Sequence, residues 1–235
     1  RPSCHDRLSE LGSHCWRAMG TSSSTSGPKT PEWSKAKSAA TRLARDRPGA
    51  SPRKVVQTAA RALGGGAGIG ATGAWVGGSA TAAQRMGGLL AGASSQGLAD
   101  TLRPFGLEDL GGKPAGEAIL EILNWIAGDS TTLDDQAARR AAEQILSELF
   151  QSEDDVFDTP VNAPEAVELF RRFLVEYLTR TMLIPLSKQL TENTGANDAR
   201  RHERDVRRVV DALVRLEFDA EEFQQVDWFG EDGAK

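Results

Sequence analysis

The residues best suited to chemistry are Met19 and Gly20, which open the run Met-Gly-Thr-Ser-Ser-Ser. This run fits the M-G-x-x-x-[ST] pattern of N-terminal acylation, a short pattern that often occurs by chance. Physically, it offers a glycine amine on a segment of small side chains that a narrow active site could admit. An α-amino pKa near ~8 leaves an appreciable neutral, nucleophilic fraction at cellular pH. Gly20 is therefore a candidate acceptor for a covalent group.

The amine of Gly20 becomes available only if Gly20 is the first residue. Either translation starts at Met19, or an upstream extension is removed there, and the composition does not decide between these routes. We predict Met19-Gly20 as the processing site. The stretch 20–28 has no apolar residue whose burial would offset the entropy of ordering, so we expect a flexible tail.

A glycine motif lies further along, where Gly68-Ile69-Gly70-Ala71-Thr72-Gly73 matches G-x-G-x-x-G. A dinucleotide site needs a strand before this motif, a helix after it and an acidic residue about 20 positions on. Here a helical pattern precedes the motif, and the first acidic residue, Asp100, comes too late. We interpret the match as a by-product of a glycine-rich segment.

Other residue types that commonly catalyse or bind metals lack the required spacing. Cys4-His5 and His14-Cys15 do not form the C-x(2–4)-C turn of zinc ligands, so we interpret them as part of a loose leader. His202 stands in an arginine-rich helical turn and is expected to be solvated. No G-x-S-x-G elbow presents a serine. The sequence predicts no catalytic residue, no metal, no cofactor and no enzymatic activity.

Two charged clusters are interpreted as solvated surface. The acidic run Glu153–Asp158 lacks the spacing of an EF-hand. The basic cluster has five arginines: Arg200, Arg201, Arg204, Arg207 and Arg208. They could contact phosphates, but Glu203 and Asp205 interleave with them and no aromatic residue stands among them. We therefore expect the outer face of an amphipathic helix there.

The composition limits the class of protein. Hydrophobic residues make up 39% of the 235 residues, which is enough for a core. Two cysteines are too few to stabilise a chain of this length, so a secreted disulfide scaffold is excluded. The cytoplasm is therefore the expected location. Residues 1–62 carry 12 Lys and Arg against 4 Asp and Glu, and the rest of the chain carries 16 against 29. The N-terminal region of the chain is thus basic and the rest of the chain is acidic.

Apolar residues recur at helical spacing from Pro31 onward, and no run alternates with a period of two over a useful length. Asn162 with Glu165 opens the strongest helical pattern. A last long helix is marked by five apolar positions: Val206, Val209, Val210, Leu213 and Leu216. The sequence therefore predicts an all-α fold, a helical bundle with a polar N-terminal tail.

Local signals give the helix ends. Ser51 and Pro52 are typical of an N-cap followed by a first-turn proline. Thr132 and Asp135 have the spacing of a capping box, and Pro185 should end or kink a helix. We divide the chain into a flexible tail (1–31, of which 1–19 could be removed), a basic helical segment (32–63), a Gly/Ala-rich helical segment (64–110), an acidic amphipathic helical region (111–225) and a C-terminal tail (226–235).

The Gly/Ala-rich segment includes Ala62–Gln84, which has no charged residue and in which eight of 23 residues are glycine. Gly66 and Gly70, then Gly73 and Gly77, are four apart, a spacing that gives a helix a flat groove for another backbone. The stretch is long enough to span a bilayer, but its small residues are poor for insertion. We expect tight packing within the protein and no stable membrane insertion.

The run Met19–Pro28 resembles the opening of the QatB family, a component of the bacterial Qat anti-phage system. In that family, an MGTSSS-type opening leads into a polar, Pro-containing linker, an Ala/Gly-rich helical body and an acidic helical C-terminal region. Over Gly64–Gly97 the similarity lies in the general Ala/Gly-rich character of the segment. The sequence departs from the pattern because eighteen residues precede Met19 and the linker from Lys29 to Trp33 is short.

The resemblance implies a partner and substrate rather than an enzyme. Qat systems pair such a protein with an ATPase, a QueC-like enzyme and a TatD-like nuclease. QueC enzymes adenylate a carboxylated 7-deazaguanine and let ammonia displace AMP. In a QueC-like relative, the amine of Gly20 could take the place of ammonia and leave an amide-linked 7-deazaguanine. Small hydrogen-bonding residues would then line the enzyme's access channel, namely Thr21, Ser22, Ser23 and Ser24, while the helical body docks the enzyme.

Two other functions stay open. A membrane-associating effector would use the Gly/Ala-rich residues 62–98. A nucleic-acid-binding module would use the basic residues 29–62 and would retain DNA in a salt-dependent way.

Overall fold

The structure is a computed structural model that describes residues 29–64, 78–128, 132–152, 157 and 159–230. Every regular element in this part of the chain is a helix, and no strand occurs there. The all-α prediction is thus confirmed. The helices form because apolar residues recur along one face of each segment and are buried in a shared core.

The helices are named here in the order in which they occur along the chain. The α-helices are α2 (Pro31–Ala44), α3 (Pro52–Ala62), α4 (Gly78–Gln96), α5 (Leu98–Leu102), α6 (Ala115–Ala127), α7 (Leu133–Ser152), α8 (Ala163–Leu183), α9 (Ser187–Glu192), α10 (Ala196–Glu217) and α11 (Ala220–Gln225). Three 3-10 turns join them: η2 (Arg103–Phe105), η3 (Glu108–Gly112) and η4 (Ile184–Leu186).

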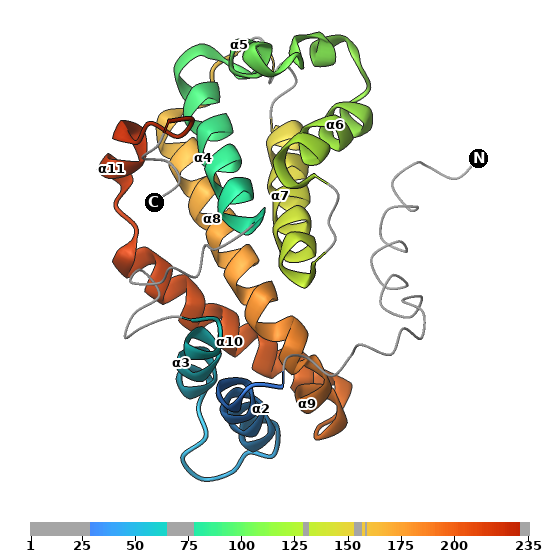
Figure 1. The fold of residues 1–235 in the computed structure, drawn as a ribbon, viewed down its shortest axis with the longest axis vertical. Coiled ribbons are helices and arrows are strands. Elements are labelled where there is room, and N and C mark those ends of the chain that lie inside the picture. Colours follow the sequence, from blue (N-terminus) through green and yellow to red (C-terminus); the bar gives the residue numbers. More distant parts are fainter. Residues whose placement is uncertain (1–28, 65–77, 129–131, 153–156, 158, 231–235) are drawn as a thin grey trace, which may run out of the picture.

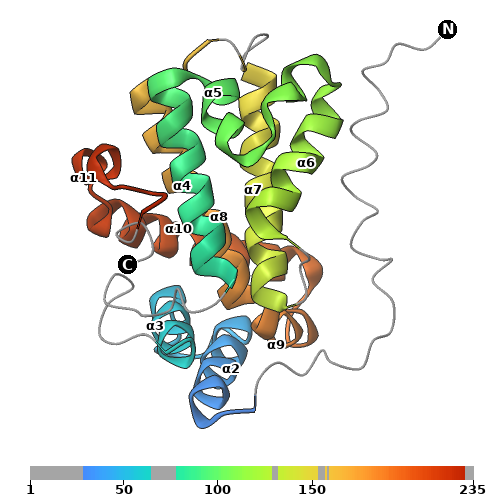
Figure 2. The ribbon, with the colours of Figure 1, turned by 45° about the horizontal axis from the view of Figure 1, so that its top comes forward.

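The long helix α8 is the centre of the fold. It packs against α4 and α7 on one side of the molecule and against α10 and α3 on the other. In Figures 1 and 2, α4, α5, α6 and α7 lie toward one end of α8, while α2, α3, α9 and α10 lie toward its other end. Phe173, in the middle of α8, has no exposed surface. Both groups of helices therefore share one hydrophobic core.

The predicted ends of α3 and α7 are confirmed. The Ser51 hydroxyl accepts a hydrogen bond from the Lys54 amide at 3.3 Å, and Pro52 is the first residue of α3. Before α7, the Thr132 hydroxyl accepts from the Asp135 amide at 3.0 Å, while the Asp135 carboxylate accepts from the Thr132 amide at 3.1 Å. These bonds satisfy amides that would otherwise lack partners at a helix start.

Helix α8 begins and ends where the sequence predicts. It starts at Ala163, directly after Asn162, although the Asn162 side chain makes no capping hydrogen bond. It ends at Leu183, and Pro185 follows inside the turn η4. A proline ring blocks the preceding turn and lacks an amide hydrogen, so the chain bends before α9.

The apolar positions that mark α10 are not all buried. Val206, Val210 and Val214 are buried, as a four-residue repeat requires, whereas 80% of Leu216 is exposed. Leu216 lies two residues beyond Val214, about 200° around the helix, so it points away from the buried stripe. The predicted last helix is present as α10, and Leu216 lies on its exposed face.

Candidate functional site

The predicted acceptor and its neighbours lie outside the described residues. Met19, Gly20 and residues 21–24 belong to residues 1–28, so the structure does not test them. The glycines of the expected groove and the G-x-G-x-x-G motif fall in residues 65–77, which are also outside. The described residues do show where the chain leaves this tail and joins the body.

The junction is fixed at the start of α2. The Thr30 hydroxyl accepts from the Trp33 amide at 3.3 Å, and Trp33 is only 4% exposed. At the other end of α2, the Arg45 guanidinium donates twice to the Asn193 side-chain oxygen, at 2.9 and 2.6 Å. Helix α2 also packs against α9 and α10. The start of α2 is therefore held at a defined point beside α9 and α10.

An aromatic cluster lies at the surface on the other half of the molecule. The ring of Phe105 lies 4.6 Å from that of Trp125 and 5.1 Å from that of Phe229, between centroids. Phe105 is 38% exposed and Phe229 48%. The Arg85 guanidinium lies 5.7 Å from the Trp125 ring centroid and donates to the Trp125 carbonyl. We call Phe105, Trp125 and Phe229 the aromatic surface.

Two glycines of α4 make room for this surface. A Cβ atom at Gly87 would lie 2.4 Å from the Trp228 ring, and one at Gly88 would lie 2.4 Å from the Phe229 ring. The Trp228 indole also donates to the Phe223 carbonyl at 3.0 Å, which fixes its orientation. The segment that follows α11 can therefore lie directly on the α4 backbone.

A comparison with family models identifies the body that carries this surface. The model described as Qat anti-phage system associated protein QatB matches residues 58–234. The chain belongs to the QatB family. The matched region starts after the run Met19–Pro28, so the helical body supports the family independently of the opening motif. No curated protein and no solved structure matches the chain.

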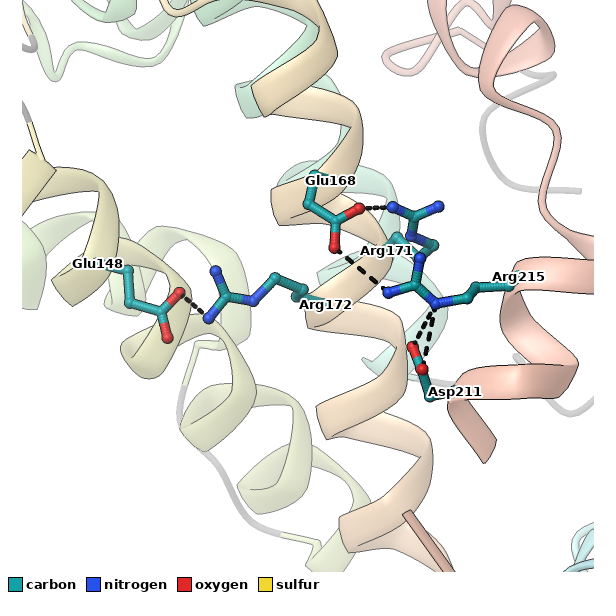
Figure 3. A network of polar contacts seen from close by, with 6 residues as sticks. All are labelled: Glu148, Glu168, Arg171, Arg172, Asp211 and Arg215. Carbon is teal, nitrogen blue, oxygen red and sulfur yellow. Dashed lines mark hydrogen bonds and ion pairs between the residues drawn. The ribbon is translucent and has the colours of Figure 1, made fainter. Parts of the chain in front are cut away.

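In this QatB family member, ion pairs connect α8 to the helices on either side (Figure 3). Arg172 pairs with Glu148 of α7 at 2.6 Å. On the α10 side, Arg215 contacts Glu168 at 3.7 Å and its own neighbour Asp211 at 3.1 Å. Exposed pairs of this kind add little stability one by one. Their clearer effect is to hold the arginine side chains in fixed directions.

A buried carboxylate lies further along α8. Glu176 is 4% exposed, and its two oxygens contact Arg180 at 2.5 Å and Arg207 at 2.6 Å. Because an unpaired buried charge is costly, Glu176 needs these guanidinium groups. One member of the basic cluster, Arg207, therefore has a structural role in joining α10 to α8.

The expectation that His202 is solvated was wrong. His202 is 3% exposed and belongs to the buried stripe of α10, four residues before Val206. Helical periodicity places His202 on the buried face of α10, although the arginines around it in the sequence suggest an exposed turn. Next to it, burial raises the pKa of the Glu203 carboxyl above its ordinary value, while Arg200 acts in the opposite direction.

Two further findings apply to the part of the chain that the structure describes. There, no three His, Cys, Asp or Glu residues are grouped as ligands for a metal ion. None of the helices in this part is long and apolar enough to cross a membrane. Cys4-His5 and His14-Cys15 lie outside the described residues.

Sequence reasoning missed the aromatic surface and the glycines beneath it. A signal existed in the pair Trp228-Phe229, two large aromatic residues inside an otherwise polar C-terminal segment. A second signal was the pair Gly87-Gly88 within a helical pattern, since glycine is costly there unless something packs closely.

Proposed function

We propose that this QatB family member is a non-enzymatic subunit of the Qat anti-phage system and the protein substrate of a QueC-like enzyme. The acceptor is the α-amine of Gly20, and the transferred group is a 7-deazaguanine carboxylate activated by adenylation. The amine attacks the carboxyl carbon, AMP leaves, the nitrogen loses a proton and an amide bond forms. The observation that carries the proposal is the run of small residues Gly20–Gly27, which stands shortly before the fixed start of α2.

The arrangement supports a tail that is delivered by a docked body. Nine peptide units separate Gly20 from Lys29, and a fully extended chain of that length spans at most about 30 Å. The active site of the modifying enzyme must then lie within that distance of Lys29, two residues before α2. Docking of the body raises the local concentration of the tail, so the tail itself can bind weakly.

Intact mass measurement and terminal peptide sequencing test the acceptor directly. After expression with the QueC-like neighbour, we expect a chain that begins at Gly20 and carries a base-sized mass. Without the neighbour, this mass should be absent. A Gly20→Val variant should lose the modification because a branched side chain crowds the amine, whereas Gly27→Val, in the same tail, should keep it. An unmodified terminus with and without the neighbour would refute the proposal.

The aromatic surface is our proposed docking site for that enzyme. Exposed aromatic rings dominate the binding energy of many interfaces, and Phe229 is the most exposed of the three. We expect Phe229→Ala to weaken binding to the QueC-like enzyme by about tenfold or more, measured by biolayer interferometry. The matched control is Leu216→Ala, which removes an exposed apolar side chain from α10. Equal affinity for both variants would place docking elsewhere and leave the Gly20 proposal standing.

A further inference from the structure

A cleft opens between α8 and α10, away from the aromatic surface. Its volume is about 310 Å³, and it is lined by Arg172, Val175, Arg204, Arg207, Arg208 and Asp211. The volume is at the lower end of the range of small-molecule sites, which begins near ~300 Å³. Four arginines thus line a space of small-ligand size.

The arginines differ in how their charges are offset. Arg172 pairs with Glu148 at 2.6 Å, Arg207 with Glu176 at 2.6 Å and Arg208 with Asp205 at 3.2 Å. Among the described residues, Arg204 has no carboxylate within ion-pair distance, and its side chain is exposed. Three of the lining arginines are therefore ion-paired and the charge of Arg204 is not offset, while Asp211, which also lines the cleft, pairs with Arg215.

We propose that this cleft binds the phosphate group of a small, nucleotide-sized ligand. Guanidinium groups bind phosphate oxygens in pairs and stack on flat rings, and Val175 adds an apolar surface for the rest of the ligand. A chain with a net charge of −5 repels most anions. A local group of arginines therefore restricts the binding of an anion to one place on the surface.

The surrounding charges favour a small ligand over a nucleic acid. A protein that follows a phosphate backbone needs a continuous basic stripe. Here Asp205 and Asp211 lie on α10 with three of the arginines, and Glu148 and Glu168 lie on α7 and α8 near the fourth, Arg172. These acids interrupt the positive field on both sides of the cleft. The cleft can therefore hold one phosphate-bearing group but not a run of them.

Isothermal titration of the full chain at low salt, with inorganic phosphate, AMP and a short single-stranded DNA as probes, tests the proposal. We expect AMP to bind with one site per chain and to compete with inorganic phosphate. Arg204→Glu should weaken AMP binding about tenfold or more, since it removes a charge-assisted hydrogen bond and adds a repulsive charge. The matched control, Arg200→Glu, changes an exposed arginine one turn earlier on α10, outside the cleft. It should bind AMP as the parent does.

The other outcomes overturn the proposal. These are no AMP binding to the parent chain, equal binding by Arg204→Glu, or an equal loss in both variants, which would indicate general charge attraction. Binding of the DNA without binding of AMP would assign the arginines to a polymer instead. Because Arg204 is exposed and has no ion pair among the described residues, thermal melting of Arg204→Glu should match that of the parent.

Discussion

Replacing Phe170 with alanine is expected to lower the free energy of unfolding by about 3–5 kcal/mol, the usual cost of removing a buried ring. Phe170 is 3% exposed. Its ring centroid lies 5.1 Å from that of Phe223 and 5.0 Å from that of Trp228. It also contacts Phe218 at 5.8 Å. The substitution therefore removes the contacts by which α8 holds α11 and the segment after it.

Urea denaturation monitored by tryptophan fluorescence would measure this effect, because Trp228 lies against the substituted ring. The control is Phe105→Ala, the same chemical change at a residue that is 38% exposed, with an expected cost of about 1 kcal/mol. A loss at Phe170 no greater than that at Phe105 would contradict the central role of Phe170.

The second prediction concerns a single added methyl group. We expect Gly87→Ala to destabilise the protein by about 1–3 kcal/mol, although alanine favours a helix over glycine by about 1 kcal/mol. The added Cβ would lie 2.4 Å from the Trp228 ring, so the ring must move. Its movement pulls the adjacent Phe229 off the aromatic surface. Affinity for a partner that binds this surface should therefore fall together with stability.

Gly116→Ala is the matched control for this change. Gly116 also lies in a helix, α6, but a Cβ there would have nothing within 4 Å. Only the helix-favouring effect remains, so this variant should match or slightly exceed the stability of the parent. The denaturation midpoints of the two variants, each compared with that of the parent, measure this difference in stability. A stabilised Gly87→Ala variant would show that Trp228 does not rest on α4.

The parts of the fold that depend on neighbouring residues could be predicted from the sequence. The capping box at Thr132 and Asp135, the start at Ser51 and the break at Pro185 all involve groups within a few positions of each other. Such signals arise from backbone amides and ring geometry, which do not depend on the rest of the chain. The family resemblance could also be seen in a short run of residues, Met19–Pro28, and the match over residues 58–234 confirms it.

The parts that depend on distant residues could not be predicted in this way. Nothing local to Gly88 indicates that Phe229, far along the chain, covers it. His202 is an intermediate case. Its four-residue spacing from Val206 and Val210 can be read from the sequence, but four nearby arginines suggest an exposed turn. The candidate acceptor Gly20 rests on sequence alone, since it lies outside the described residues.

The attachment of α2 to α9 has a consequence for the order of events during protein synthesis. Arg45 and Asn193, which join the two helices, are 148 positions apart in the chain. A ribosome that adds about 5–20 residues per second needs roughly 7–30 s to pass from one to the other. Until then α2 and α3 can pack on each other, but α2 lacks its contacts with α9 and α10. The start of α2 is therefore held in its final place only after α9 and α10 have been made. A modifying enzyme that requires that geometry would act on chains synthesised at least that far and leave shorter ones unmodified.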